Sequence, residues 1–227
     1  MFQDLWRFLK TMNKRTVIVS GGMIEEEFAL GILNDEDTEV IIGVDKGLMF
    51  LYEHGINPNY IVGDFDSASG EVLEYYRGKN IPMRKFNPVK DASDTEIALR
   101  LCMDLRRKHI LIIGGTGLRM DHTWANVQSL KLALDAGADA RIVDSHNQIR
   151  LLNQDFVLRR AEAFGPYFSV FPLGMSVTDF NISGAKYPLS HHTLTPYNSL
   201  CVSNEFAGEK VEISFPYGEV ILMETKD

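Results

Sequence analysis

Short apolar runs alternate with amphipathic helical patterns from residue 16 to about residue 145. This alternation is typical of strand–helix–strand units, whose strands form a parallel sheet. Between the runs, apolar residues recur at three- and four-residue spacing, and glycine closes several segments as it does at helix ends. The expected strands are TVIVS, EVIIGVD, YIVGD, HILIIGG and ARIVD. The expected helices are IEEEFALGILN, KGLMFLYEHG, GEVLEYYRG, DTEIALRLCMDLRR and DHTWANVQSLKLALDAG.

After Asp144 the pattern changes to short segments in which apolar and polar residues alternate, with turn residues between them. Such segments favour an antiparallel β domain. The expected strands are QIRLLN, FVLRR, YFSVFPL, SVTDFNIS, SLCVSN, KVEISF and EVILMET. The sequence therefore predicts an α/β fold, with a Rossmann-like parallel-sheet domain over residues 1–145 followed by a smaller antiparallel β-sandwich domain over residues 146–227. Residues 1–15 are expected to form an N-terminal extension of the first domain.

The N-terminal extension has the spacing of a short amphipathic helix, with apolar side chains at Phe2, Leu5, Trp6 and Leu9. Charged residues interrupt it too often for a signal-peptide core. The chain also lacks an apolar run of the ~20 residues that a membrane span needs. We therefore expect a cytoplasmic protein that does not engage a membrane.

Composition narrows the classes of partner. The chain has 31 acidic and 23 basic residues and a formal net charge of -8, which argues against a broad nucleic-acid footprint. The two cysteines, Cys102 and Cys201, are far apart and lack a CxxC partner, so the sequence suggests neither a disulfide framework nor a zinc site. The negative net charge is still compatible with an anionic substrate that binds through a metal ion.

Six aspartates follow strands or precede helices at one expected edge of the parallel sheet. Ligands of open parallel sheets bind outside the carboxyl ends of the strands, where loops and helix N-termini gather. Asp64 and Asp66 are two positions apart in YIVGDFDS, so their side chains project to the same side of an extended chain. The full set is Asp45, Asp64, Asp66, Asp91, Asp94 and Asp121.

Converging carboxylates need a cation, because two unit charges 4 Å apart repel by about 4 kcal/mol at an effective dielectric of 20. Mg²⁺ is the expected occupant, since it selects oxygen ligands and no cysteine or paired histidine competes. Structural roles compete with this interpretation for single residues. Ser93 and Glu96 match a capping box in SDTE, where Asp94 complements the helix dipole; Asp121 has the position of an N-cap; and DFDS alone reads as a turn.

The segment GGTGLR, residues 114–119, is a candidate phosphate cradle, because glycines let backbone N–H groups approach an anion. The motif lacks the third glycine of GxGxxG, so taken alone it favours a tight left-handed turn. Arg119 has the planar fork that pairs with phosphate oxygens, and its competing role is a surface charge. His122 is expected in the first turn of a helix rather than as a catalytic base.

Taken together, these segments resemble the thiamine pyrophosphokinase family. GVDKGLMFLYEHGINPNYIVGDFDS, KDASDTEIAL and GGTGLRMDHTWANVQSL are similar to that family's blocks in order and spacing, and GAKYPL and VSNE resemble segments of its second domain. The similarity spans roughly residues 16 to 220. It implies an ATP-dependent enzyme that transfers a pyrophosphoryl group to the hydroxyl of thiamine, giving thiamine diphosphate and AMP. It also implies a homodimer with sites at the subunit interface.

The resemblance assigns roles residue by residue. The α/β domain is expected to hold ATP and Mg²⁺, and the β domain is expected to help hold thiamine. The implied catalytic residues are Asp64, Asp66, Asp91, Asp94 and Asp121. The first four of these, Asp64, Asp66, Asp91 and Asp94, are the implied metal ligands. The implied nucleotide-side positions are Asp45, Gly47, Thr95, Gly115, Gly117, Arg119 and Asn126. The implied contacts to the aminopyrimidine of thiamine are Ser203 and Asn204, which without the family read as a polar turn.

Three positions depart from the family's pattern. Lys46 replaces a small residue, Ser93 replaces threonine, and Leu118 replaces a frequent glycine. Ser93 keeps the hydroxyl that a helix cap needs, whereas Lys46 either adds a phosphate contact or points to solvent. The alternatives for function are a pyrophosphokinase for another alcohol such as a pterin, a non-catalytic sensor of thiamine or nucleotide, and a general Mg²⁺-dependent phosphohydrolase.

Overall fold

The computed structural model describes residues 9, 10, 12–63, 70–85, 92–117 and 119–227. The chain divides into two compact units, one formed by Asn13–Ser145 and the other by His146–Asp227 together with the described residues before Asn13. The expected extension was assigned to the first domain, whereas Leu9 and Met12 are buried and belong to the second unit. The other positions of the expected N-terminal helix, Phe2, Leu5 and Trp6, lie outside the described residues.

In the described residues of the first unit, six parallel strands form the sheet, in the order β6-β5-β1-β2-β3-β4. The strands are β1 (Arg15–Val19), β2 (Thr38–Val44), β3 (Tyr60–Gly63), β4 (Met83–Lys85), β5 (His109–Ile113) and β6 (Asp139–Val143). The helices are α2 (Glu26–Leu33), α3 (Gly47–Glu53), α4 (Gly70–Gly78), α5 (Asp94–Asp104) and α6 (Met120–Asp135). The predicted α/β alternation is confirmed; the short edge strand β4 is the addition.

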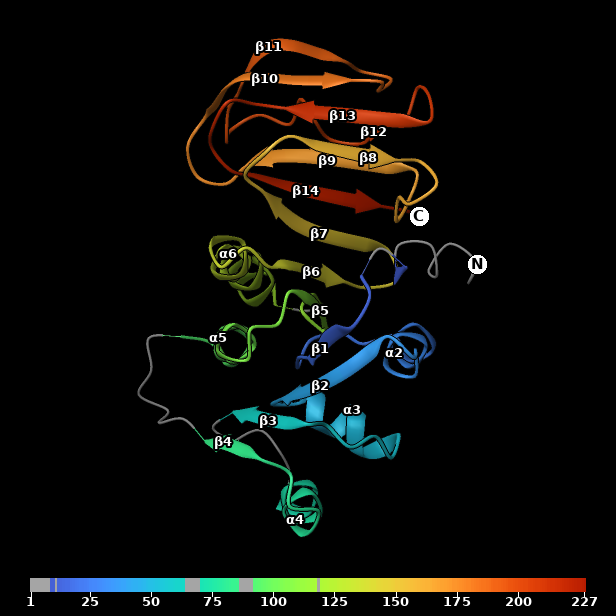
Figure 1. Ribbon diagram of the computed structural model, residues 1–227, viewed down its shortest axis with the longest axis vertical. Helices are drawn as coiled ribbons and strands as arrows, with labels where there is room; N and C mark the ends of the chain where they lie inside the picture. Colours follow the sequence, from blue (N-terminus) through green and yellow to red (C-terminus); the bar gives the residue numbers. More distant parts are fainter. Residues whose placement is uncertain (1–8, 11, 64–69, 86–91, 118) are drawn as a thin grey trace. The chain divides into compact units, whose positions relative to one another are not determined.

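Helices cover both faces of this sheet. Figure 1 shows α2 and α3 on one face and α5 and α6 on the other. The central strand β1 is buried along its whole length, as a strand between two helical layers must be. Successive strands run outward from β1 to β4, and the chain then returns through α5 to place β5 on the other side of β1. The strand order therefore reverses between β1 and β5.

The second unit contains two antiparallel sheets. One has the order β12-β9-β14-β7 and the other β11-β10-β13-β8. The strands are β7 (Asn147–Leu152), β8 (Phe156–Arg159), β9 (Tyr167–Pro172), β10 (Val177–Ser183), β11 (Leu189–Leu194), β12 (Asn204–Glu205), β13 (Lys210–Ser214) and β14 (Val220–Thr225). One apolar cluster takes side chains from both sheets, including Phe168 of β9 and Phe180 of β10, so the predicted sandwich is confirmed.

Two strand assignments in this unit differ from the sequence prediction. The segment SLCVSN is a turn up to Ser203, whose φ of +54° is left-handed, and only Asn204 begins β12. The alternation there does not reflect a strand, because a turn also leaves Leu200 and Val202 exposed and Cys201 buried. The sequence also missed β11, because most of LSHHTL faces solvent and carries no apolar pattern. Among the described residues, none of the helices combines the length and apolar content that crossing a membrane requires.

Candidate active site

The loops that leave β1 and β5 lie side by side where the strand order of the sheet reverses. Backbone hydrogen bonds join them: the Ser20 N–H donates to the Ile113 carbonyl at 2.9 Å, and the Gly22 N–H donates to the Gly114 carbonyl at 2.8 Å. Gly114 has a φ of +65°, and a Cβ on it would lie 2.4 Å from the Ser20 carbonyl oxygen. The predicted left-handed turn in GGTGLR is therefore present, and a side chain at Gly114 would separate the loops.

A cavity of about 560 Å³ opens above these two loops. Its wall combines backbone of the glycine-rich loops with polar side chains from the starts of α5 and α6. Ligands of open parallel sheets bind at such a reversal point, so the location fits a functional site. The lining residues are Ser20, Gly21, Gly22, Met23, Asp45, Lys46, Ser93, Asp94, Thr95, Gly114, Gly115, Thr116, Gly117, Arg119, His122, Thr123 and Asn126.

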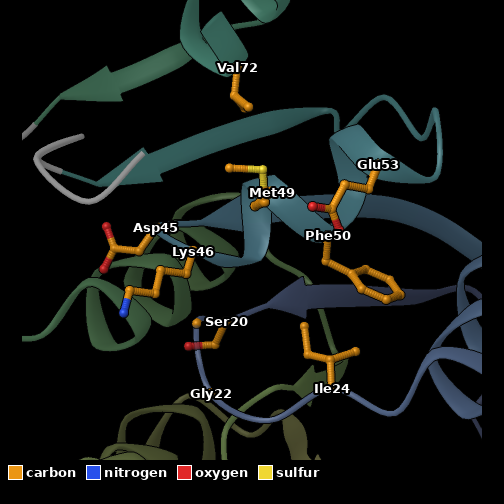
Figure 2. A pocket seen from close by; sticks show the side chains of 10 residues that line it. Ser20, Gly22, Ile24, Asp45, Lys46, Met49, Phe50, Glu53 and Val72 are labelled. Atoms are coloured by element: carbon orange, nitrogen blue, oxygen red, sulfur yellow. The ribbon is translucent and has the colours of Figure 1, made fainter. Parts of the chain in front are cut away.

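A second cavity, of about 480 Å³, adjoins the first and extends along α3 (Figure 2). Its additional lining is mainly apolar and comes from α3, α4 and the loop after β1. Figure 2 shows the Phe50 ring facing Ile24, while Asp45 and Lys46 lie at the opposite end. The residues common to both cavities are Ser20, Gly21, Gly22, Asp45 and Lys46.

The start of α5 borders the first cavity. Ser93 is the N-cap residue, and its Oγ accepts a hydrogen bond from the Glu96 N–H at 3.2 Å, which confirms the predicted cap. The capping box is only half formed, because the Glu96 carboxylate binds Arg100 at 2.7 Å. Asp94 is the first helical residue and lines the cavity. Thr95 is buried, and its Oγ1 lies 2.7 Å from Ser20 Oγ, which ties α5 to the end of β1.

Two side chains support the loop after β5. Asn126 is buried in α6, and its Nδ2 donates to the Gly115 carbonyl at 2.8 Å. The Thr116 hydroxyl donates to Asp144 Oδ2 at 2.7 Å, just beyond the end of β6. Gly115 and Gly117 both line the cavity, and their nucleotide-side role stays a prediction. Asn126 therefore supports this loop from α6, because its buried amide donates a hydrogen bond to the loop backbone.

Arg119 and Asp121 form an ion pair at the start of α6. The Arg119 Nη2 lies 2.5 Å from Asp121 Oδ2, and both side chains are about two-thirds exposed. The hydrogen bond from Arg119 lowers the pKa of Asp121, and its bond to Asp121 raises the pKa of Arg119. The N-cap interpretation of Asp121 is wrong: Arg119 has that position, and Asp121 is the second helical residue. His122 lies in the first helical turn, as expected, and borders the cavity.

Asp45 and Gly47 connect β2 to α3. Asp45 has a φ of +45°, a left-handed conformation that aspartate tolerates better than most residues, and it lines both cavities. A Cβ on Gly47 would lie 2.1 Å from the Val19 carbonyl oxygen. Gly47 thus lets α3 begin directly against the end of β1, which is a supporting role.

The metal-ligand prediction falls mostly on a part of the chain that the structure does not describe. Asp64, Asp66 and Asp91 lie outside the described residues, and Asp94 is the described member of the set. Within the described residues no group of three His, Cys, Asp or Glu side chains is arranged to hold a metal ion. The metal cluster therefore stays a prediction.

Ser203 ends the turn before β12, and Asn204 is the first residue of that strand in the second unit. Asn204 is buried, its Oδ1 accepts the Tyr187 N–H at 3.0 Å, and its Nδ2 donates to the Tyr187 carbonyl at 2.8 Å. Ser203 is exposed, and its N–H donates to Ser169 Oγ at 3.0 Å. The Asn204 amide thus holds neighbouring backbone, while the Ser203 side chain faces solvent.

The sequence missed the segment Ser20–Met23 as part of the site. Its signal was present, because the glycine pair of VIVSGGM directly follows a buried strand. Glycines at the carboxyl end of a parallel strand mark a place where backbone approaches a ligand or a neighbouring loop. The segment has no charged residue, so the site predicted from the clustered aspartates did not include it.

Replacing Asn126 with alanine is expected to lower the free energy of unfolding by about 1–3 kcal/mol, because the buried Gly115 carbonyl loses its amide donor. Urea denaturation followed by circular dichroism measures the change. The matched control is Gln128→Ala, an exposed position on the same helix, which should change stability by at most about 0.5 kcal/mol. Equal stability of the two variants would contradict the supporting role of Asn126.

Family models match both units. Residues 34–142 match the catalytic domain of thiamin pyrophosphokinase, and residues 154–220 match the vitamin B1 binding domain of thiamin pyrophosphokinase. Thiamine pyrophosphokinase from Bacillus subtilis is 30% identical over 219 residues, covering 96% of this chain and 100% of that protein.

Solved structures are similar over nearly the whole chain. The crystal structure of the Bacillus subtilis thiamine pyrophosphokinase has a TM-score of 0.82 at 30% identity, covering 94% of this chain and 100% of that one. The structure of thiamin pyrophosphokinase from Geobacillus thermodenitrificans has a TM-score of 0.81 at 30% identity, covering 94% and 98%. The chain belongs to the thiamin pyrophosphokinase family.

Proposed function

We propose that this protein transfers the pyrophosphoryl group of ATP to the hydroxyl of thiamine, giving thiamine diphosphate and AMP. The observation that carries the proposal is the match of both units to the family's catalytic and vitamin B1 binding models. The cavity at the reversal point of the sheet supports it, because glycine-rich backbone and Asp94 border the space in which a polyphosphate would lie.

The proposed reaction is a displacement at phosphorus. The thiamine hydroxyl oxygen forms a bond to the β-phosphorus of ATP, and the bond from that phosphorus to the oxygen shared with the α-phosphorus breaks. AMP leaves with the electron pair, and the hydroxyl proton passes to a base. Positioning and electrostatic stabilisation supply most of the acceleration in phosphoryl transfer. The rigidly joined loops after β1 and β5 provide that positioning.

Mg²⁺ fits the chemistry of the cavity. The Asp45 and Asp94 carboxylates offer hard oxygen ligands at its wall. Neither thiol lines the cavity: both are buried, and burial raises the pKa of Cys102 to about 12 and that of Cys201 to about 11. The proposed ligands are Asp64, Asp66, Asp91 and Asp94. When bound, the metal neutralises charge on the phosphate oxygens.

The sequence left Asp94 and Asp121 as alternatives for the base that accepts the hydroxyl proton. The geometry favours Asp94, because it lines the cavity at the start of α5. Asp121 is held by Arg119, and its lowered pKa makes it a weaker proton acceptor. We therefore assign Asp121 to holding Arg119 at the cavity wall, where the guanidinium would pair with phosphate oxygens of the nucleotide.

The proposed thiamine contacts in the second unit are Ser203 and Asn204, within the part matched by the vitamin B1 binding model. Ser203 is exposed and adopts a left-handed φ of +54°. Asn204 is committed to the Tyr187 backbone. We therefore propose that Ser203 makes the direct contact and that Asn204 fixes the backbone which presents it.

Product analysis tests the proposed function. Purified protein incubated with thiamine, ATP and Mg²⁺ should release AMP and thiamine diphosphate in equal amounts, resolved by chromatography. Formation of ADP and thiamine monophosphate would overturn attack at the β-phosphorus. Turnover of a pterin alcohol in place of thiamine, thiamine binding without AMP, or phosphate release that ignores thiamine would each replace the proposal with one of its alternatives.

Asp94→Asn should lower the turnover number on the order of 10²-fold or more, since it removes a carboxylate at the reacting phosphates while keeping the start of α5. The matched control is Asp104→Asn at the other end of the same helix, where Asp104 is exposed and 3.5 Å from Arg84. That variant should turn over like the parent protein. Full activity of Asp94→Asn, with both variants folded, would remove Asp94 from the metal and base roles.

We also propose that the protein is a cytoplasmic homodimer, as the family resemblance implies. Light scattering of the purified protein should then give twice the chain's mass of 25.6 kDa. A mass that stays at one chain across the concentrations used for activity would contradict an active site shared between subunits.

A further inference from the structure

Lys46 stands on the wall that the two cavities of the first unit share. It follows Asp45 directly after β2, and its backbone conformation is helical, with φ −62° and ψ −21°. A Cβ on Gly21 would lie 3.2 Å from the Lys46 Cβ, so the loop after β1 passes close beside the base of the lysine side chain. Figure 2 shows the extended side chain of Lys46 at the same end of the cavity as the Asp45 carboxylate.

Lys46 brings to this junction a positive charge that no ion pair with a described residue neutralises. Both cavities have carboxylates in their walls, from Asp45, Asp94 and Glu53. Arg119 is already paired with Asp121. None of the ion pairs formed between described residues includes Lys46, and its side chain is exposed. An ammonium group in this position can bind an anion without first breaking an ion pair.

The two cavities differ in chemistry. The first is lined by glycine-rich backbone and hydroxyls, which suits phosphate oxygens. The second takes Ile24, Met49 and Phe50 in its wall, which suits a flat, largely apolar ring. A nucleoside triphosphate combines these two ends in one molecule. A nucleotide that extends through both cavities must therefore pass Lys46 where its polyphosphate chain begins.

We propose that Lys46 is a positioning residue that binds the polyphosphate of the nucleotide at the junction of the two cavities. This inference rests on the proposed function, since it names a further group that holds the same ATP. The flexible four-carbon stem of lysine lets the ammonium follow the phosphate oxygens, and the absence of a side chain at Gly21 leaves room for the start of that stem.

Calorimetric titration of the whole protein with three probes tests the role directly. Lys46→Ala should bind ATP and inorganic tripolyphosphate about tenfold more weakly than the parent protein, since a hydrogen bond to a charged group is lost. Adenosine, which carries no phosphate, should bind as before. Lys46→Arg should recover most of the loss for both anions, and added salt should narrow the difference between the parent protein and Lys46→Ala.

Lys79→Ala is the matched control. Lys79 is an exposed lysine of the same unit, and its Nζ lies 4.5 Å from the centre of the Tyr75 ring rather than at either cavity. This variant should bind all three probes like the parent protein. Equal weakening of anion binding in the two variants would mean that net charge, not the position of Lys46, accounts for the effect, and would overturn the proposal.

Kinetics separate this proposal from the proposed function. Lys46→Ala should raise the KM for ATP about tenfold with little change in the KM for thiamine. If the parent protein makes thiamine diphosphate while Lys46→Ala binds ATP and tripolyphosphate unchanged, only the role of Lys46 is overturned. A loss of adenosine binding equal to that of ATP would also overturn it, in favour of a structural role. If the parent protein makes no thiamine diphosphate but its ATP binding still depends on Lys46, the proposed function fails and the Lys46 assignment holds.

Discussion

The hydrogen bonds between the loops after β1 and β5 are the constraint on which the candidate active site depends. These loops belong to adjacent strands, yet they are more than 90 residues apart in the chain. Their backbone groups pair with each other, so both loops keep a single path. Thr95 and Asn126 then attach α5 and α6 to the same loops through buried side chains. The loops after β1 and β5 and the helices α5 and α6 thus form one connected floor of the cavity. The positions of Asp94 and Arg119 depend on this floor.

The charges at this floor create an electrostatic problem that the substrate would make worse. Carboxylates line both cavities, and a polyphosphate would bring further negative charge among them. Two like unit charges 4 Å apart repel by about 4 kcal/mol at an effective dielectric near 20. Cations must therefore accompany the nucleotide. A metal ion at Asp94 would supply one, and the side chains of Lys46 and Arg119 offer two more on the wall of the first cavity.

The sequence predicted those parts of the molecule whose signals are local. Buried parallel strands such as β1 read as continuous apolar runs, and residues after such strands fall at one edge, so Asp45 and the Gly114 turn were located correctly. The prediction failed at β11, where most side chains face solvent and no apolar pattern marks the strand. It also failed around Cys201, where a turn has the alternation of polar and apolar residues that is typical of a strand. Contacts between distant segments could not be predicted, because the residues near Ser20 give no local signal that its hydroxyl contacts Thr95, 75 residues later.

The buried residues of the site determine the shape of the cavity floor, and the exposed residues determine the charge of its wall. Thr95, Asn126 and Gly47 contact backbone or other buried groups, so changing them alters the shape of the floor before it alters any ligand contact. Lys46 and Arg119 are exposed and lie on the wall, so changing them alters charge while the floor stays intact. Substitution is therefore expected to disturb the floor less at Lys46 than at Gly47, where a Cβ would lie 2.1 Å from the Val19 carbonyl oxygen. Substitution at the exposed positions therefore changes the charge of the cavity wall, whereas the path of the loop backbone in the floor is set by the buried contacts.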